Sequence, residues 1–390
     1  MTIKEQIKKF IPKPLLGAYH YIWAFLAAVI FGFPSKNLTV IGVTGTSGKS
    51  TTCGFIARIF EESGARVASL SSIGFKVAGK EWENKYKMTM PGRFVVQKFL
   101  RQAKNSGCKY VILEVTSEGT RQFRHKFINF DTAVFTNLGR EHIESHGGFE
   151  NYRNAKLELF KAAKNTHVIN ADDENAKYFL DVAANKKITF GIKDAKELGL
   201  KLNLMGGFNI MNAMAAIFVA KNYGVPLDVC KRALEKTKGI PGRMEVVSEN
   251  PLVIIDYAHT PEQLEAAYKS FAGKNLVCVL GSCGGGRDKW KRPVLGEIAK
   301  KYCKEIIITN EDPYDENPME IINQVASTAG EKSQKILDRK QAIRVAVELA
   351  KPGDAVIVTG KGSEPWMCVA NGKKIPWDDR QIAKEALQKK

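Results

Sequence analysis

A glycine-rich segment near the N-terminus contains the residue types that hold the phosphates of a nucleoside triphosphate. An apolar run at residues 40–43 precedes the loop Gly45-Thr46-Ser47-Gly48-Lys49-Ser50-Thr51, and an apolar helical pattern follows it. Glycines let backbone N–H groups converge on phosphate oxygens, the Lys49 ammonium can reach the terminal phosphates, and the Ser50 hydroxyl can ligate Mg²⁺. A turn without a function would need neither the lysine nor the flanking elements. The segment therefore predicts an enzyme that uses ATP.

Two further segments place acidic and histidine side chains after predicted strands. Glu114 lies near the end of the apolar run 110–115, and residues 141–146 contain two glutamates and two histidines shortly after the run 132–136. Ligands of open parallel sheets bind at the carboxyl ends of the strands, where a carboxylate is a natural ligand for Mg²⁺. A polar surface loop is the alternative interpretation of residues 141–146.

The second of these segments, with its continuation to residue 160, resembles the Mur ligases, in particular the MurE branch that extends the UDP-N-acetylmuramoyl dipeptide of peptidoglycan. The resemblance covers residues 38–390, and its separate motifs agree in order. The short loop Gly-Thr-x-Gly-Lys-Ser/Thr is the form that the family uses. It accounts for Val43, which stands where the usual phosphate loop has a glycine.

The resemblance implies a set of catalytic residues and cofactors. Catalytic roles would fall to Lys49, Glu114, His142 and Lys156. ATP would be used with two Mg²⁺ ions: Ser50 and Glu114 would bind one, and His142 the second. Lys156 would join the second site in a carbamylated form, because the added carboxylate can ligate a metal. Beyond the loop, the nucleotide would contact Asn209, Arg243, Asp256 and His259.

The same resemblance implies two sets of substrate-binding residues. The acceptor, a UDP-muramoyl peptide, would be held by Thr89, Thr116, Ser117, Gln122 and Arg124. The incoming amino acid would be held by Arg287, Glu311, Asp312, Pro313, Tyr314, Gly360 and Glu364. The implied reaction begins when the acceptor carboxylate attacks the γ-phosphate of ATP, and the amine then attacks the acyl phosphate to leave an amide. The enzyme would thus be an ATP-dependent acid–amino-acid ligase of peptidoglycan precursor synthesis.

The substrate-facing motifs depart from the pattern of the family. Members that add diaminopimelate carry Asp-Asn-Pro-Arg, whose arginine grips the distal carboxylate, whereas this chain has Tyr314 in the place of the arginine. We therefore expect diaminopimelate to be disfavoured. Ser363 and Glu118 stand where the family usually has histidine. About 37 residues precede the first predicted strand, where the family has a whole UDP-binding domain. A lipid-linked or truncated acceptor is therefore an alternative to the UDP-linked one.

Alternating strand and helix patterns predict an α/β protein. Residues 38–239 would form a central P-loop ATPase-like domain with a mostly parallel sheet, and residues 240–390 a C-terminal Rossmann-like α/β domain. Predicted strands of the first domain lie at residues 40–43, 110–115, 132–136, 167–170 and 188–190. Those of the second lie at residues 252–256, 276–280, 305–309 and 355–359, with helices at 261–271 and 341–350.

Charge and cysteine content narrow the class of protein. The formal net charge of +18 suits a substrate that carries a diphosphate, and the basic residues are scattered, which argues against a nucleic-acid partner. The seven cysteines include no C-x-x-C pair, which indicates a reducing compartment and argues against disulfides or a structural zinc site. We expect a cytoplasmic monomer.

Residues 1–37 form a separate N-terminal segment. Lys4, Lys8, Lys9 and Lys13 precede an uncharged, aromatic-rich run at residues 15–33. No small-residue cleavage site follows, as a signal peptide would require, and a spanning helix after these lysines would put the catalytic part outside the cell. We expect an aromatic helix that lies in the inner membrane interface, giving a peripheral association, or that packs on the enzyme. A simple buried helix is the alternative.

Other activities compete with this interpretation. A related ligase could add amino acids to another acceptor, as polyglutamate-forming or folate-type synthetases do. The combination of Thr116, Gln122 and Arg124 favours the muramoyl acceptor. A P-loop kinase would not need the motifs at residues 242–364, and a non-catalytic scaffold would release no ADP in response to an amino acid.

Overall fold

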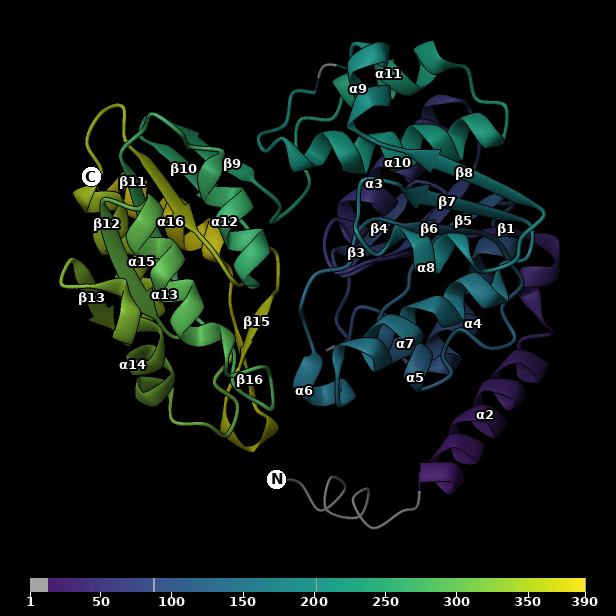
Figure 1. The fold of residues 1–390 in the computed structure, drawn as a ribbon, viewed down its shortest axis with the longest axis horizontal. Helices are drawn as coiled ribbons and strands as arrows, with labels where there is room; N and C mark the ends of the chain where they lie inside the picture. Colours follow the sequence, from purple (N-terminus) through teal and green to yellow (C-terminus); the bar gives the residue numbers. More distant parts are fainter. Residues whose placement is uncertain (1–12, 87, 201, 390) are drawn as a thin grey trace.

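Two sheets, each covered by helices on both faces, organise the chain (Figure 1). The computed structural model describes residues 13–86, 88–200 and 202–389. Residues 39–190 build an eight-stranded sheet, and residues 245–358 build a six-stranded sheet. The predicted α/β fold class is confirmed.

The eight-stranded sheet has the order β4-β3-β2-β5-β1-β6-β7-β8. The strands from β2 across to β8 pair in parallel, and β3 and β4 extend the sheet in antiparallel fashion. The strands are β1 (Thr39–Thr44), β2 (Val67–Leu70), β3 (Gly74–Val77), β4 (Lys80–Glu83), β5 (Tyr110–Glu114), β6 (Phe130–Phe135), β7 (Thr166–Asn170) and β8 (Lys186–Phe190).

Helices cover both faces of this sheet, which explains the uninterrupted apolar runs at residues 40–43 of β1 and 110–113 of β5. Val40 packs in the cluster that includes α4 and α7, whereas its neighbour Ile41 packs in the cluster that includes α3 and α10. The helices are α3 (Lys49–Glu62), α4 (Arg93–Asn105), α5 (Ser117–Arg121), α6 (Ile143–His146), α7 (Phe149–Ala162), α8 (Ala176–Leu180), α9 (Ile192–Leu198), α10 (Phe208–Asn222) and α11 (Leu227–Glu235).

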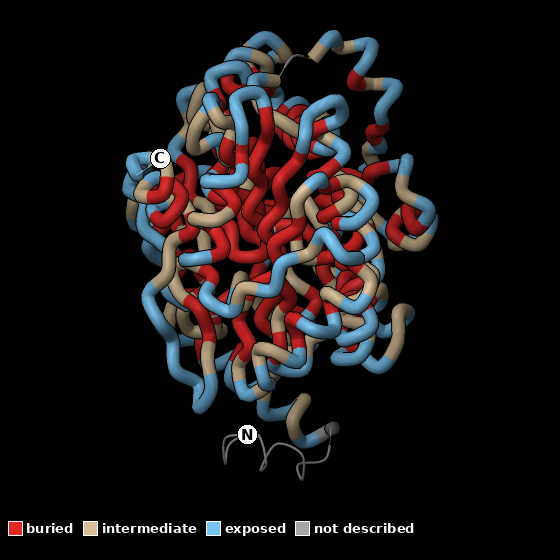
Figure 2. Tube along the Cα trace, turned by 90° about the vertical axis from the view of Figure 1, so that its left-hand side faces the viewer, coloured by how far each residue is buried: buried red, intermediate tan, exposed pale blue. Residues whose placement is uncertain are grey.

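The six-stranded sheet has the order β13-β12-β11-β14-β10-β9, parallel except for β9. Its strands are β9 (Glu245–Glu249), β10 (Leu252–Ile255), β11 (Leu276–Leu280), β12 (Glu305–Thr309), β13 (Ser333–Ile336) and β14 (Ala355–Val358). Helices α12 (Pro261–Lys269), α13 (Lys291–Tyr302) and α14 (Pro318–Ala329) cover one face. Helices α15 (Arg339–Leu349) and α16 (Asp379–Gln388) cover the other. Figure 2 shows the buried residues gathered in the interior and the exposed residues at the periphery.

Small elements complete the fold. The 3₁₀ helices η1 (Pro34–Asn37) and η2 (Ala370–Gly372) connect larger elements, and β15 (Trp366–Cys368) pairs with β16 (Lys374–Pro376). Helix α2 (Lys13–Ile30) contacts α4. Among the described residues, no helix combines the length and the hydropathy needed to cross a membrane. Lys4, Lys8 and Lys9 lie outside the described residues.

All of the strands predicted from the sequence are present, with ends that differ by at most two residues. The strands that were not predicted are β2 to β4, β9, β13, β15 and β16. Most of them lie toward sheet edges or in the small hairpin, and β4 has four exposed residues. Strands β4, β9 and β16 bury little surface, so their sequences carry no continuous apolar run. Strand β2 is buried but has only four residues, which is too short for a distinctive pattern.

A buried ion pair fixes helix α16 against the start of α15. The guanidinium of Arg339 donates to both carboxylate oxygens of Asp379 at 3.0 and 2.7 Å, and both side chains have no exposed surface. Replacing Asp379 by asparagine leaves a buried guanidinium without its counter-charge. We expect a loss of about 3 kcal/mol in the free energy of unfolding of this unit, measured by urea denaturation followed by circular dichroism.

An exposed pair between the same two helices provides the control. Lys340 and Glu385 lie 3.2 Å apart with well-exposed side chains. Glu385→Gln should leave the denaturation midpoint unchanged within error, because solvent screens such pairs. Equal midpoints for Asp379→Asn and the wild-type protein would contradict the assigned role of the buried pair.

Candidate active site

The predicted phosphate loop joins the end of β1 to the start of α3, at the carboxyl edge of the eight-stranded sheet. Asn137, which follows β6, accepts hydrogen bonds from the backbone N–H groups of Thr46 at 2.9 Å and of Ser47 at 2.9 Å. A Cβ at Gly45 would lie 1.9 Å from Thr136 Oγ1, so only glycine fits there. The neighbouring strand β6 thus shapes the loop, and the N–H groups of the first turn of α3 face the space above it.

Ser50 and Glu114 meet directly beside this loop. Strand β5 lies next to β1, and the register pairs Val43 with Glu114. Ser50 Oγ donates to Glu114 Oε2 at 2.8 Å, and the backbone N–H of Ser72 donates to the same oxygen at 2.9 Å. Glu114 is 2% exposed. The two residues predicted to share one cation are therefore adjacent, and Ser72 is a third member of the group that the sequence interpretation missed.

Lys156 and Lys49 lie on either side of the loop. Lys156 Nζ donates to Gly45 O at 2.6 Å and lies 4.5 Å from the centre of the Tyr152 ring, while Lys49 Nζ donates to Thr46 O at 2.8 Å. Burial, and next the charge of Lys49, hold the pKa of Lys156 well below its usual value. Burial also lowers the pKa of Lys49. The amines of Lys156 and Lys49 thus both lie against backbone carbonyls of the phosphate loop.

His142 lies above the same loop in a left-handed backbone conformation, with φ 58°. Its ring centre is 6.2 Å from that of Tyr152, whose hydroxyl lies 3.0 Å from Thr46 Oγ1. Arg287 Nη1, from the other sheet unit, lies 3.1 Å from His142 Nδ1. Burial, followed by the charge of Arg287, lowers the pKa of His142. The neutral imidazole that results is the form that binds metals.

Of the residues predicted to contact the nucleotide beyond the loop, Asn209 and Arg243 lie near the phosphate loop and the Glu114 group, whereas Asp256 and His259 contact backbone groups of their own sheet unit. Asn209 accepts a hydrogen bond from Asn212, which packs against Gly48 of the loop. Arg243 Nη2 reaches Ser72 Oγ at 3.1 Å and so joins the group around Glu114. The carboxylate of Asp256 accepts from the backbone N–H groups of Met244 and Ala258, and His259 Nδ1 lies 2.8 Å from Tyr257 O. Asp256 therefore holds the Arg243 segment in place.

The residues predicted for the acceptor gather around α5. Arg124 is buried and donates to Gln122 Oε1 at 2.6 Å, and it also contacts Met88 and Met90, which flank Thr89. Burial lowers the pKa of Arg124 to about 10. The hydroxyl of Thr116 caps α5 by accepting from Gly119 N, and Ser117 Oγ lies 3.1 Å from His146 Nε2. All five predicted residues therefore belong to one neighbourhood.

The residues predicted for the amino acid surround Glu311. Its Oε1 accepts from Cys283 Sγ at 3.0 Å, and a Cβ at Gly360 would lie 2.0 Å from Oε2. Within the described part of the chain, Oε2 is buried and has no hydrogen-bond partner. Asp312 pairs with Lys361 at 2.9 Å, and Lys361 also pairs with Glu364. The remaining members of this neighbourhood are Pro313 and Tyr314, which approach Gly284 and Gly285.

Contacts between the two sheet units close the site. Asp288 accepts from the backbone N–H groups of Ile143 at 3.2 Å and Glu144 at 3.0 Å, at the start of α6. Lys291 pairs with Glu141 at 3.3 Å, and both are buried. Gln263 on α12 donates to Ser47 Oγ at 2.8 Å. These C-terminal residues were not predicted, because no local pattern marks a contact with a distant loop.

The chemistry of the ligand set fits Mg²⁺. Ser50 and Glu114 supply hard oxygen donors, and Mg²⁺ is usually held by one or two carboxylates together with phosphate oxygens and water. Across the residues described, no group of three or more His, Cys, Asp or Glu side chains forms a ready-made metal cluster.

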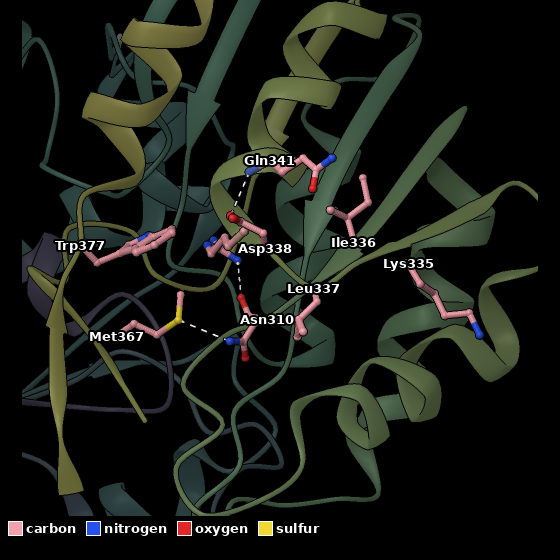
Figure 3. A pocket seen from close by; sticks show the side chains of 9 residues that line it. Asn310, Lys335, Ile336, Leu337, Asp338, Gln341, Met367 and Trp377 are labelled. Carbon is pink, nitrogen blue, oxygen red and sulfur yellow. Dashed lines mark hydrogen bonds between the residues drawn. The ribbon is translucent and has the colours of Figure 1, made fainter. Parts of the chain in front are cut away.

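A separate pocket of about 670 Å³ opens at the carboxyl ends of β12 and β13. Figure 3 shows Asn310, Leu337, Met367 and Trp377 around it. None of the predicted site residues lines this pocket, although Asn310 directly precedes Glu311. The pocket is therefore distinct from the group of residues between the two sheet units.

Comparisons with known proteins agree with this geometry. Residues 43–198 match the model of the Mur ligase middle domain, and residues 242–362 match that of the Mur ligase glutamate ligase domain. The chain is 36% identical to the UDP-N-acetylmuramoyl-L-alanyl-D-glutamate–2,6-diaminopimelate ligase of Syntrophomonas wolfei subsp. wolfei (strain DSM 2245B / Goettingen), over 94% of this chain and 82% of that protein.

Two solved structures share the arrangement of elements. A UDP-N-acetylmuramoyl-L-alanyl-D-glutamate–2,6-diaminopimelate ligase superposes with a TM-score of 0.59 at 28% identity, covering 90% of this chain and 78% of that one. A bifunctional folylpolyglutamate synthase/dihydrofolate synthase from Yersinia pestis, solved with AMPPNP and a Mn ion, superposes with a TM-score of 0.72 at 19% identity, covering 97% and 98%. The second likeness concerns the fold alone.

Proposed function

Because the chain belongs to the Mur ligase family, we propose that it is an ATP-dependent ligase that adds an amino acid to the carboxylate of a UDP-N-acetylmuramoyl peptide in peptidoglycan precursor synthesis. The observation that carries this proposal is the contact between the two sheet units at the loop. Arg287, on the amino-acid side, lies 3.1 Å from His142, on the phosphate side. This contact supports a site at which a nucleotide, an acceptor and an amine would meet.

The proposed reaction has two bond-forming steps. The acceptor carboxylate oxygen bonds to the γ-phosphorus of ATP as the bond to the bridging oxygen breaks, which releases ADP. The amine nitrogen then bonds to the carbonyl carbon, loses a proton to solvent and expels phosphate. Lys49, whose amine donates to Thr46 O in the phosphate loop, would stabilise the charge on the transferring phosphoryl group.

Magnesium would supply charge neutralisation between the two anions that must approach each other. We assign Ser50 and Glu114 to one ion, and His142 with a carbamylated Lys156 to the second. Lys156 is 2% exposed, and no acidic group lies within ion-pair distance of its amine among the described residues. Burial favours the neutral form of this amine, which is the form that reacts with CO₂. The carbamate that results, with release of one proton, would provide an anionic oxygen ligand for the ion.

The substrate assignments follow the two neighbourhoods described above. The guanidinium of Arg124 beside Gln122 suits an anionic part of the acceptor. The unpartnered Oε2 of Glu311 suits the ammonium of the incoming amino acid, and Arg287 suits its carboxylate. ATP supply places the working enzyme in the cytoplasm, and nothing in this scheme requires a nucleic acid or a second copy of the chain.

A reconstitution experiment tests the proposal. The protein is incubated with ATP, Mg²⁺, a panel of amino acids, and either UDP-muramoyl dipeptide or its lipid-linked form, and phosphate release and product mass are measured. We expect phosphate release only when both acceptor and amino acid are present. Release with folate or a polyglutamyl acceptor, and with neither muramoyl acceptor, would replace this proposal by the folate-type alternative.

The same panel tests amino-acid choice. Tyr314 cannot form the bidentate pair that an arginine makes with a distal carboxylate, so we expect lysine or another amino acid to be used faster than diaminopimelate. Tyr314→Arg should raise the relative kcat/KM for diaminopimelate about tenfold, the value of one charge-assisted contact. Tyr314→Lys is the control, because it adds the charge without the planar fork. Faster turnover of diaminopimelate than of every other amino acid by the wild-type protein would contradict this prediction.

A further inference from the structure

Helix α2 turns an apolar face toward solvent. Its exposed large side chains are Leu15, Tyr19, Tyr21, Ile22, Trp23, Phe25, Leu26, Val29 and Ile30. Ile30 is 66% exposed and Leu15 62% exposed, and residues 14–35 contain no Asp, Glu, Lys or Arg. A helix face in contact with water normally carries polar residues. A contiguous apolar surface of this kind marks a place where something other than water binds.

The opposite face of α2 already has its partner. Ala24, Ala27 and Ala28 are buried, and their small side chains let the helix approach α4 closely. Trp23 and Tyr21 are partly exposed but also reach the enzyme: the ring centre of Trp23 lies 5.7 Å from that of Phe94, and the ring centre of Tyr21 lies 5.0 Å from that of Phe127. The alternative of a simple buried helix therefore does not hold. Figure 1 shows α2 at the edge of the molecule, where its outer face is open.

Basic residues border this apolar face, and acidic residues are absent from the elements that form it. Residues 13–60, which include α2, and residues 93–113, which include α4, contain no Asp or Glu. Lys36, Lys98 and Arg101 are exposed along these elements. Apolar and aromatic side chains suit a layer of acyl chains, and a cationic border suits anionic groups above that layer. The two features together match a surface whose apolar interior lies beneath an anionic outer layer.

We propose that α2 and the basic face of α4 dock on the surface of an anionic phospholipid bilayer. The apolar side chains of α2 would enter the level of the headgroups and upper acyl chains, while Lys36, Lys98 and Arg101 meet lipid phosphates. A second copy of the chain fits this surface less well, because a symmetric contact would place two cationic borders against each other without acidic partners.

The docking surface is connected to the residues assigned to the acceptor. Arg93 Nη2 lies 2.5 Å from His20 Nδ1 on α2 and donates to Gln122 O at 2.6 Å, and Gln122 Oε1 accepts from Arg124. A docked helix would thus hold the acceptor neighbourhood close to the bilayer. This consequence rests on the proposed function, whereas the docking itself does not.

A vesicle sedimentation experiment with the full chain tests the docking without catalysis. Vesicles of phosphatidylglycerol with phosphatidylethanolamine are compared with vesicles of phosphatidylcholine alone. We expect about fivefold more protein in the pellet with the anionic vesicles, and about tenfold weaker binding for Lys98→Gln/Arg101→Gln. Ile22→Gln/Leu26→Gln should reduce binding to background. Protection of residues 15–30 from hydrogen exchange should appear only with anionic vesicles.

Matched variants on α9 and α15, both away from α2 in Figure 1, serve as controls. Ile192→Gln combined with Leu349→Gln changes two exposed apolar residues elsewhere, and Lys193→Gln/Lys196→Gln removes two exposed charges, so both should bind like the wild-type protein. Equal pelleting with both vesicle types, or full binding by Ile22→Gln/Leu26→Gln, would overturn the proposal. A wild-type protein that forms a dimer and does not bind vesicles would also overturn it, if Ile22→Gln/Leu26→Gln dissociates that dimer. Ligase activity with a soluble acceptor is measured separately. Absence of that activity would contradict the proposed function and would leave the vesicle-binding result unaffected.

Discussion

Replacing Glu114 by glutamine should lower kcat by about 10³ or more, because the site loses the only charge of its first Mg²⁺ ligand pair and several kcal/mol of transition-state stabilisation. The shape of the side chain stays the same, so the hydrogen bonds with Ser50 and the Ser72 backbone can persist. The effect should therefore appear in catalysis and in the Mg²⁺ concentration needed for half-maximal rate. Phosphate release across a Mg²⁺ titration measures both.

Glu150→Gln is the matched control for this variant. Glu150 lies on α7, the helix that carries Lys156, and its side chain is 82% exposed. The control should retain wild-type kcat and the wild-type Mg²⁺ requirement. Equal kcat for Glu114→Gln and Glu150→Gln would remove Glu114 from the proposed metal site. A fall in kcat together with lost secondary structure would point to misfolding, so circular dichroism spectra accompany the assay.

The sequence predicted the central strands because burial on both faces forces them to be continuously apolar. Residues 276–280 are entirely apolar and residues 306–308 form the apolar centre of 305–309, and the structure has strands with the bounds 276–280 and 305–309. Strand β4, with every residue exposed, gives no such signal. Edge strands form because a neighbour supplies hydrogen bonds, and a single sequence does not reveal that neighbour.

Glu114 and the phosphate loop were predicted from motifs, whereas Thr136 was not, and the convergence of all three follows from topology. Glu114, Thr136 and the phosphate loop come from β5, β6 and β1, which are neighbours in the sheet, so their carboxyl ends meet. Ser72 belongs to the same edge, since it follows β2, but a serine after a short strand carries no distinctive pattern. Motif reasoning thus finds residues that are unusual for their position and misses ordinary residues that only the fold makes important.

The contacts across the two sheet units could not be predicted at all. Asp288 is bonded to the start of α6, and Lys291 is paired with Glu141 some 150 positions away. Acidic and basic residues at these positions would suit a solvated loop equally well. These residues form contacts only because the two sheet units face each other in this arrangement. Many contacts together determine that arrangement, and no short sequence pattern encodes it.

Lys156→Ala should lower kcat by about 10³, the loss expected when a metal ligand worth several kcal/mol is removed. The lysine amine is buried beside Gly45 O and the Tyr152 ring, so two roles are compatible with its position. It could act as a cation toward the phosphates, or as a carbamate toward the second Mg²⁺. Truncation alone does not separate the two roles, because either loss would reduce the rate.

Chemical rescue separates them, since truncation leaves space for a small molecule at this position. If the working group is a carbamate, acetate or propionate should restore part of the activity of Lys156→Ala, whereas ethylamine should not. If the working group is an ammonium, the pattern should be reversed. A ¹³C NMR signal from the wild-type protein in ¹³C-bicarbonate, absent in Lys156→Ala, would identify the carbamate directly. Rescue by ethylamine without such a signal would refute the carbamate and leave Lys156 as a second cation beside Lys49.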